Sequence, residues 1–229
     1  MIIITIILGI CSIVGWSLYF ISCRKIMHKE CENWTKPELT EWDMQCMAYH
    51  ESGHAICSYF LPEREKLLKI TIDPSEKAFG MIQCTHRLHH NESEVSLMST
   101  IATFLAGRLA EEQFLGLKTT SAFYDFATAR DIAIDMVTKF GMGRQMRKLV
   151  CNSMRDGTYM LHSEHFRKIA DEDVLDIIEK AESAARKILE EHKDTVSLLA
   201  RELLKKKTLS SREIEQFFYN EQGNEKKIL

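Results

Sequence analysis

The pentapeptide His50-Glu51-Ser52-Gly53-His54 has the residue types and spacing of a metal-dependent hydrolase. In a helix, residues i and i+4 project from one face, so the imidazoles of His50 and His54 can bind a single ion. Glu51 follows the first histidine and can reach a water molecule beside that ion without binding the ion itself. Zinc is typical of this pattern, because it lowers the pKa of such a water towards about 7 and polarises a scissile carbonyl.

The pentapeptide alone does not settle the chemistry, because two histidines on an exposed helix face are the alternative interpretation. Apolar neighbours at Met44, Met47, Ala48 and Ile56 weaken that alternative, since they give the helix a buried face. A catalytic zinc also needs a third protein ligand and an open fourth position. No His, Asp or Glu after His54 has a short spacing that would supply that ligand.

The elements that must position this pattern are a helix and two strands. The helix is expected to begin after Thr40, an N-cap residue with Asp43 in the first turn, and to stop before Pro62. Two short strands are expected at residues 67–73 and 79–84, with turn residues between them.

Helical periodicity dominates the rest of the chain. Helices are expected at about 93–115, between a loop at 116–122 and Gly141, at 171–192, at 194–206 and, after a capping box of Ser210 and Glu213, through 217–218. Residues 144–168 have no clear period. The predicted fold class is therefore mainly α with a small β-sheet.

Composition excludes several classes of protein. The 229 residues are 45% hydrophobic and 28% charged, which excludes both wholesale disorder and a polytopic membrane protein. A net charge of −3 lacks the basic excess of a nucleic-acid-binding domain, so no nucleic-acid partner is expected. Only 3 Pro and 10 Gly argue against an all-β sandwich. The seven Cys include no C-x-x-C pair and are typical of reduced thiols in the cytosol.

The N-terminus has the pattern of a membrane anchor. Residues 1–23 contain no Asp, Glu, Lys or Arg and are long enough to cross a bilayer core of about 30 Å. Basic residues follow at 24, 25 and 29, which places the large C-terminal part in the cytosol. A cleaved signal peptide is the alternative, but it would have basic residues before the apolar run. We expect one transmembrane helix at 1–23, a charged connector at 24–40, a catalytic domain at 41–220 and a polar tail at 221–229.

Several motifs in order resemble the FtsH family of membrane-anchored zinc metalloproteases. The first is A-Y-H-E-S-G-H-A at 48–55, which is similar to the family's zinc motif. It is followed by L-A-G-R-L-A-E-E at 105–112, T-T-S-A-F-Y-D at 119–125 and M-V-T-K-F-G-M at 136–142. The resemblance covers about residues 44–218 and implies an FtsH peptidase-like helical domain with a Zn²⁺ cofactor. It also implies that Glu51 is the catalytic base.

The resemblance also implies the third zinc ligand. The family segment is close to T-G-A-S-N-D, and its aspartate falls on Asp125, so His50, His54 and Asp125 would hold the metal. From the residues alone, an aspartate before an apolar periodic run is typical of a helix N-cap. The segment departs from the family pattern at Ser121, Phe123 and Tyr124.

Two more groups are candidates for supporting roles. Glu111 and Glu112 could include a carboxylate that accepts a hydrogen bond from a ligating imidazole, the alternative being a solvated helix face with one carboxylate paired to Arg108. The resemblance implies that the second strand aligns substrate by β-addition, the alternative being an ordinary hairpin. The candidate substrate-binding residues are Phe79, Gly80, Met81, Ile82 and Gln83.

FtsH-type proteases carry an ATPase module, and this chain has no G-x-x-x-x-G-K-[ST] motif. We therefore expect a single-pass metalloendopeptidase, facing the cytosol, that hydrolyses unfolded or membrane-associated proteins without an ATPase of its own. By the resemblance it would form a homo-oligomeric ring or dock on an ATPase partner. The alternative is a non-cleaving membrane subunit that binds or regulates a full-length FtsH-type protease. A third interpretation, a plain helical domain, would require all the ordered matches to be coincidental.

Overall fold

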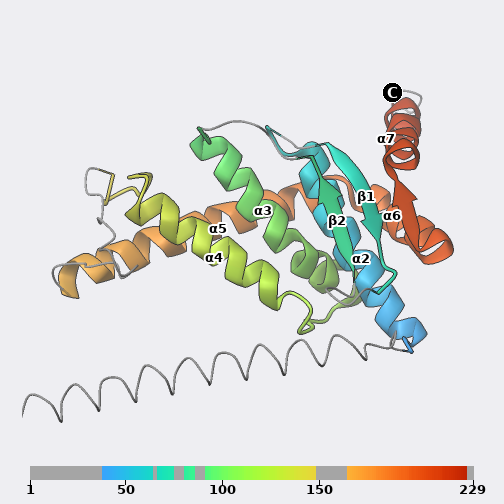
Figure 1. The fold of residues 1–229 in the computed structure, drawn as a ribbon, viewed down its shortest axis with the longest axis horizontal. Coiled ribbons are helices and arrows are strands. Elements are labelled where there is room, and N and C mark those ends of the chain that lie inside the picture. Colours follow the sequence, from blue (N-terminus) through green and yellow to red (C-terminus); the bar gives the residue numbers. More distant parts are fainter. Residues whose placement is uncertain (1–37, 64–65, 75–79, 86–90, 148–163, 226–229) are drawn as a thin grey trace, which may run out of the picture. The chain divides into compact units, whose positions relative to one another are not determined.

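The computed structural model describes residues 38–63, 66–74, 80–85, 91–147 and 164–225 (Figure 1). The expected anchor, most of the expected connector and Phe79 lie outside the described residues. Within the described ranges, no helix combines the length and the apolar character needed to cross a membrane. The elements below all belong to one compact unit, Leu39–Asp73 with Phe79–Leu229.

The helix that carries the histidines is the centre of this unit. Helix α2 (Glu41–Phe60) begins at the expected capping box, in which the Thr40 hydroxyl accepts from the Asp43 N–H at 3.1 Å and the Asp43 carboxylate accepts from the Thr40 N–H at 3.0 Å. It ends where Leu61 turns to an extended conformation before Pro62. Both expected boundaries are confirmed, and most of the residues in its second half are buried.

Three helices cover α2. Helix α3 (Glu94–Ala110) packs closely along it, because a Cβ at Gly53 would lie only 2.7 Å from the Cβ of Ala110. Helix α6 (Lys193–Lys206) covers α2 with fully buried apolar residues, and α5 (Glu164–Glu191) completes the core. Helix α4 (Phe123–Thr138) packs on α3, and α5 runs behind both in the view of Figure 1.

A small antiparallel sheet lies beside α2. Its strand order is β2 (Met81–Cys84), β1 (Leu67–Thr71), β3 (Thr208–Ser210). The central residue Ile70 is fully buried and pairs with Ile82 on one side and Leu209 on the other. Among the described strands, β2 pairs with β1 alone and is therefore an edge strand. The two expected strands are present, whereas β3 is too short to have been recognised from an alternating pattern.

The ends of three helices differ from expectation. The helix after residue 93 does not stay α-helical to 115: it changes at Glu111–Leu115 into a π-helical turn, η1. Helix α5 begins at Glu164, earlier than the expected 171, and α7 spans Ser211–Glu225, so it includes part of the expected polar tail. The first residues of α5 are mostly exposed and therefore show no apolar period. A π-helical turn has no periodic signature of its own.

Candidate metal centre and active site

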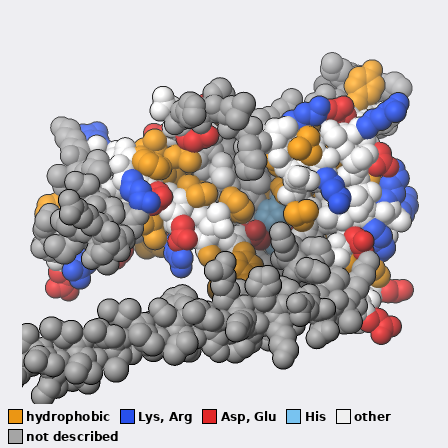
Figure 2. Space-filling view, viewed as in Figure 1, with side chains coloured by type: hydrophobic (Ala, Val, Ile, Leu, Met, Phe, Trp, Pro, Cys, Tyr) orange, Lys and Arg blue, Asp and Glu red, His pale blue; other side chains and the backbone are white. Residues whose placement is uncertain are grey.

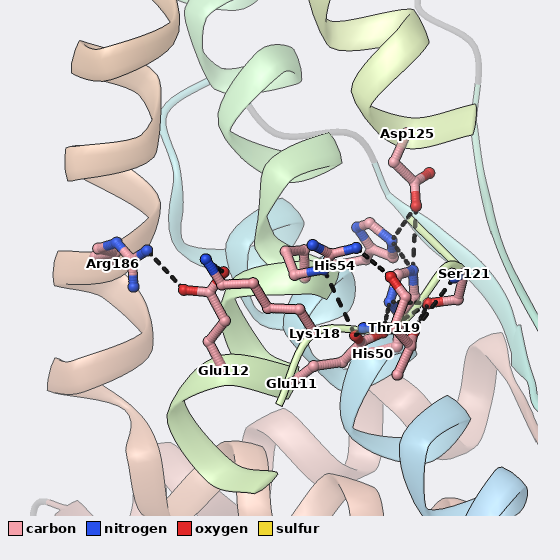
Figure 3. Close-up of polar contacts among 10 residues, drawn as sticks. His50, His54, Glu111, Glu112, Lys118, Thr119, Ser121, Asp125 and Arg186 are labelled. Carbon is pink, nitrogen blue, oxygen red and sulfur yellow. Dashed lines mark hydrogen bonds and ion pairs between the residues drawn. The ribbon is translucent and has the colours of Figure 1, made fainter. Parts of the chain in front are cut away.

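Side chains from two helices meet at one point (Figure 3). His50 and His54 lie one turn apart on α2, and their Nε2 atoms are 2.9 Å from each other. Asp125 lies in the first turn of α4, with Oδ2 at 3.1 Å from His50 Nε2 and 3.4 Å from His54 Nε2. Asp125 is therefore not the helix N-cap, which is Ala122. Both histidines are buried, and Asp125 is only about one-fifth exposed.

The donor set fits a zinc ion. Tetrahedral zinc with bonds of about 2.0–2.1 Å separates its ligand atoms by roughly 3.3 Å, and the three separations here lie between 2.9 and 3.4 Å. His54 Nδ1 lies 2.7 Å from the carbonyl oxygen of Thr103, which can only accept, so Nδ1 carries the hydrogen. That arrangement leaves the Nε2 lone pair directed at the common point. The His-His-Asp cluster thus has the chemistry of a zinc site.

A glycine on the facing helix makes room for the imidazoles. A Cβ at Gly107 of α3 would lie 2.5 Å from His54 Nε2 and 2.7 Å from His50 Nε2. Only a hydrogen fits at this point, so α3 can approach the two ligands closely enough to bury them. The sequence displays Gly107 within a helical run, where glycine costs about 1 kcal/mol relative to alanine. A glycine at this helical position indicates that another element packs closely against it, which the apolar periodicity does not reveal.

Glu111 contacts Nδ1 of His50, the ring nitrogen that does not face the cluster. Its side chain is fully buried, and Oε1 lies 2.7 Å from His50 Nδ1 and accepts from the Ser121 hydroxyl at 2.6 Å. The other oxygen accepts the Thr119 N–H at 3.0 Å and lies 3.6 Å from Arg108 Nε. Burial alone would raise the pKa of Glu111, but these hydrogen bonds and the charge of His50 lower it to about 2. The carboxylate is therefore ionised and holds the hydrogen on Nδ1 of His50.

Glu112 does not share this role. Its carboxylate pairs with Arg186 of α5 at 2.9 Å and with Lys118 at 3.4 Å. Figure 3 shows it directed towards Arg186, away from the imidazoles. Of the two glutamates considered from the sequence, only Glu111 contacts a histidine of the cluster. The π-helical turn begins at Glu111, so a regular α-helical pattern could not have told the two apart.

The proton on His50 is held by two carboxylates. Burial alone would lower the pKa of His50, but hydrogen bonds to Asp125 and Glu111 raise it to about 9. Hydrogen bonds and charge from His50 and His54 lower the pKa of Asp125 well below its usual range, although burial opposes this. A metal ion that binds here must therefore displace the proton from His50.

Glu51 is buried beside the His-His-Asp cluster and contacts Gly80, the residue immediately before β2. Burial raises the pKa of Glu51, and the charges of the two histidines partly offset that effect. A Cβ at Gly80 would overlap the Glu51 carboxylate oxygen Oε1, so strand β2 begins against Glu51. Met81 is exposed, and Ile82 and Gln83 follow it along the free edge of the described sheet.

The face drawn in Figure 2 is hollowed where histidine is visible, with hydrophobic side chains on both sides. Two aromatic residues next to Asp125 are the most exposed large apolar groups of this region: Phe123 is 69% and Tyr124 78% exposed. Their rings contact each other edge to face at 5.1 Å. The following Phe126 is 42% exposed and packs under the guanidinium of Arg108 at 5.5 Å.

Comparison with known proteins gives one consistent result. Residues 38–217 match the model of the family described as Peptidase family M41. The chain is 31% identical over 183 residues to an ATP-dependent zinc metalloprotease FtsH of Cupriavidus metallidurans, which covers 77% of this chain and 28% of that protein. Proteins of the same description from Thermus thermophilus and Bacillus subtilis are 32% and 30% identical, and the matches cover 78% and 77% of this chain. The chain spans less than one third of the length of these relatives.

Proposed function

Because this chain belongs to peptidase family M41, we propose that it is a zinc metalloendopeptidase that hydrolyses peptide bonds of unfolded or membrane-associated proteins. The observation that carries the proposal is the convergence of His50 Nε2, His54 Nε2 and Asp125 Oδ2 within 4.8 Å of one another. These three atoms would hold the metal. When bound, zinc supplies Lewis-acid chemistry, which polarises the scissile carbonyl and lowers the pKa of a water.

Glu51 is proposed as the general base. Its carboxylate would take a proton from the attacking water and return it to the nitrogen of the leaving amine. Burial, which raises the pKa of Glu51, supports this role, because a carboxylate with a raised pKa is a stronger base and takes the proton from the attacking water more readily. Glu111 would keep the Nδ1 hydrogen on His50, so that Nε2 remains available to the metal.

We propose that the substrate adds to the edge of β2. The main-chain groups of Gly80, Met81, Ile82 and Gln83 would pair with an extended peptide, as in other complexes formed by β-addition. The close approach of Gly80 to Glu51 supports this proposal, since a peptide paired with β2 would pass beside the base. Phe79 was expected to take part and stays a prediction.

The cellular setting is part of the proposal. The uncharged run at 1–23 would anchor the protein in a membrane, and the basic residues after it favour a cytosolic catalytic domain at 41–220. Its substrates would already be unfolded or would be delivered by an ATPase partner, a proposal that rests on the similarity to ATP-dependent FtsH proteases. A ring of copies is proposed from the family resemblance.

The test uses the full chain in mild detergent with two variants of α2. Glu51→Gln keeps the size of the base and removes its charge, and Glu41→Gln makes the same change at an exposed position on the same helix. Zinc per chain and cleavage of an unfolded protein without ATP are measured for all three. Stoichiometric zinc throughout, with cleavage lost only in Glu51→Gln, is the expected result.

Two outcomes would change the conclusion. Zinc in every variant and cleavage in none, even with the unfolded substrate in excess, would favour the non-cleaving membrane subunit that binds or regulates a full-length protease. A parent chain without zinc would overturn the metal site itself.

A further inference from the structure

We propose that Ser121 is a positioning residue for the metal: its hydroxyl holds the Glu111 carboxylate against His50 and thereby slows the loss of zinc. The inference rests on the proposed zinc site but concerns a residue outside the ligand set and outside the base. Ser121 lies in the loop between η1 and α4, two residues before the first residue of α4.

The hydroxyl of Ser121 is placed to serve Glu111. Ser121 Oγ donates to Glu111 Oε1 at 2.6 Å, the oxygen that also lies 2.7 Å from His50 Nδ1. Ser121 Oγ is itself 3.4 Å from His50 Nδ1, so the serine, the carboxylate and the imidazole form one compact contact (Figure 3). A charged, buried acceptor gains most from such a bond, because hydrogen bonds to ionised groups are roughly twice as strong as neutral ones.

The neighbouring groups leave the serine hydrogen free for this bond. The hydroxyl of Thr119 lies 2.6 Å from Ser121 Oγ and can donate to it, while the Ser121 N–H donates to Thr119 Oγ1 at 3.2 Å. Arg108 donates to the Thr119 carbonyl and holds the same loop. The Thr119 hydroxyl also lies 3.1 Å from Glu111 Oε1, to which it can donate, but its contact with Ser121 Oγ is the shorter one. When Thr119 donates to Ser121, the Ser121 hydrogen is directed to Glu111. The hydroxyl hydrogen bonds therefore lead to the Glu111 carboxylate, which in turn contacts His50.

This arrangement links the two halves of the metal site. His50 is reached from Ser121 through Glu111, and Asp125 follows Ser121 by four residues in the same segment. A loop tied to Glu111 therefore restrains both the α2 ligand and the α4 ligand. Since a group that fixes a ligating imidazole typically changes metal affinity 10- to 100-fold, and Ser121 acts one step further out, its loss should accelerate zinc release about three- to ten-fold.

The experiment measures zinc release from the full chain into excess chelator, which does not depend on cleavage. Ser121→Ala and Ser121→Gly each remove the hydroxyl, and the glycine variant has the residue of the resembling family segment. Ser121→Thr restores a hydroxyl. Ser197→Ala, which removes a hydroxyl bonded to the Lys193 carbonyl on α6, is the matched control. The absorption spectrum of the cobalt-substituted chain and the melting temperature of the metal-free chain are recorded for each.

Faster release in the alanine and glycine variants, a shifted cobalt spectrum, and parental behaviour of Ser121→Thr and Ser197→Ala are expected. Release at the parental rate from both hydroxyl-free variants would overturn the role of Ser121 while leaving the proposed protease intact. The role would also be overturned if only the melting temperature fell. A parent chain that binds no zinc would instead overturn the proposed function and this inference together.

Discussion

Gly80 abuts the carboxylate of Glu51, so the edge strand and the helix that carries the proposed base share a border with no room for a side chain. The border has a functional consequence under the proposed mechanism. A peptide aligned on β2 is brought to Glu51 by the same backbone that confines the carboxylate. The base and the substrate strand are therefore positioned relative to each other by one contact.

Gly80→Ala should reduce kcat about 10- to 100-fold while zinc binding stays at the parental level. The added Cβ would push the Glu51 carboxylate aside, and a displacement of about 1 Å at a reacting group can cost 100-fold. Steady-state cleavage and zinc content are compared with those of Lys69→Ala, a partly exposed position on the neighbouring strand β1. Parental kcat in Gly80→Ala would show that Glu51 does not need this confinement.

Gly107→Ala should abolish stoichiometric zinc binding. A methyl group there would occupy the space of the two imidazole Nε2 atoms. The same methyl group overpacks the metal-free chain, which typically costs about 1–3 kcal/mol and opposes the gain of about 1 kcal/mol that alanine has over glycine in a helix. Zinc per chain after dialysis and the melting temperature of the metal-free chain separate the two effects. Full zinc occupancy in this variant would mean that the imidazoles can leave their present position and still bind.

Zinc affinity should fall as the pH falls. The metal-free His50 has a pKa of about 9, so at neutral pH zinc must displace one proton from it. Asp125, whose pKa is lowered, stays ionised and releases none in this range. Competition with a chelator should show the apparent affinity falling about tenfold for each pH unit between 8 and 6. An affinity independent of pH over that interval contradicts the charged pairing of His50 with its two carboxylates.

Glu213→Gln should remove an acid-sensitive part of the stability of the chain. Hydrogen bonds from the Ser210 N–H and hydroxyl, and from Lys206, lower the pKa of Glu213 to about 2 from a usual value of 4.5. Because the folded pKa is the lower one, this contribution is present above pH 4.5 and is lost as the pH falls towards 2. Denaturant unfolding from pH 6 to 2 should show the parent and the variant converging at the acid end. If the difference in the free energy of unfolding between parent and variant stayed constant across that range, the Glu213–Ser210 hydrogen bonds would not be its source. Glu179→Gln, on the exposed face of α5, serves as the control.

Phe123→Ser combined with Tyr124→Asn should leave the free energy of unfolding within about 0.5 kcal/mol of the parent. Both rings are largely exposed, so the fold does not depend on them. The KM for an unfolded apolar substrate should rise about two- to tenfold, because aromatic contacts beside the site are worth about 0.5–1.5 kcal/mol. Zinc content is measured to check that the substitutions leave Asp125 undisturbed, and it should be unchanged. Tyr219→Asn, at an equally exposed tyrosine on α7, is the matched control. An unchanged KM would place substrate elsewhere.

The local features of the fold were predictable from the sequence because they depend on neighbouring residues. The capping box at Thr40, the stop before Pro62 and the i, i+4 pair of histidines all follow from helix geometry. The two strands of the hairpin follow from alternation and turn residues. These rules operate within a few residues of chain, and within that range the structure agrees with them.

The rest of the site depends on contacts between distant segments. Asp125 is 75 residues from His50, and only the family resemblance pointed to it, since its local pattern is that of a helix cap. The rotation that turns Glu111 and not Glu112 towards His50 coincides with a π-helical turn, which has no periodic signature. Ser121 was visible as a departure from the family segment, but its partner could be identified only in three dimensions.

The pairing of β1 with β3 bears on how the protein is made. Thr71 and Thr208 share a hydrogen bond at 2.7 Å across 137 residues, and α6, which covers α2, is also encoded late. During synthesis, the ribosome therefore releases the histidine helix long before the segments that pack on it exist. The pairing of β1 with β3 cannot form before residue 210 has been translated. The nascent polypeptide thus carries the proposed zinc ligands well before it can hold them in place.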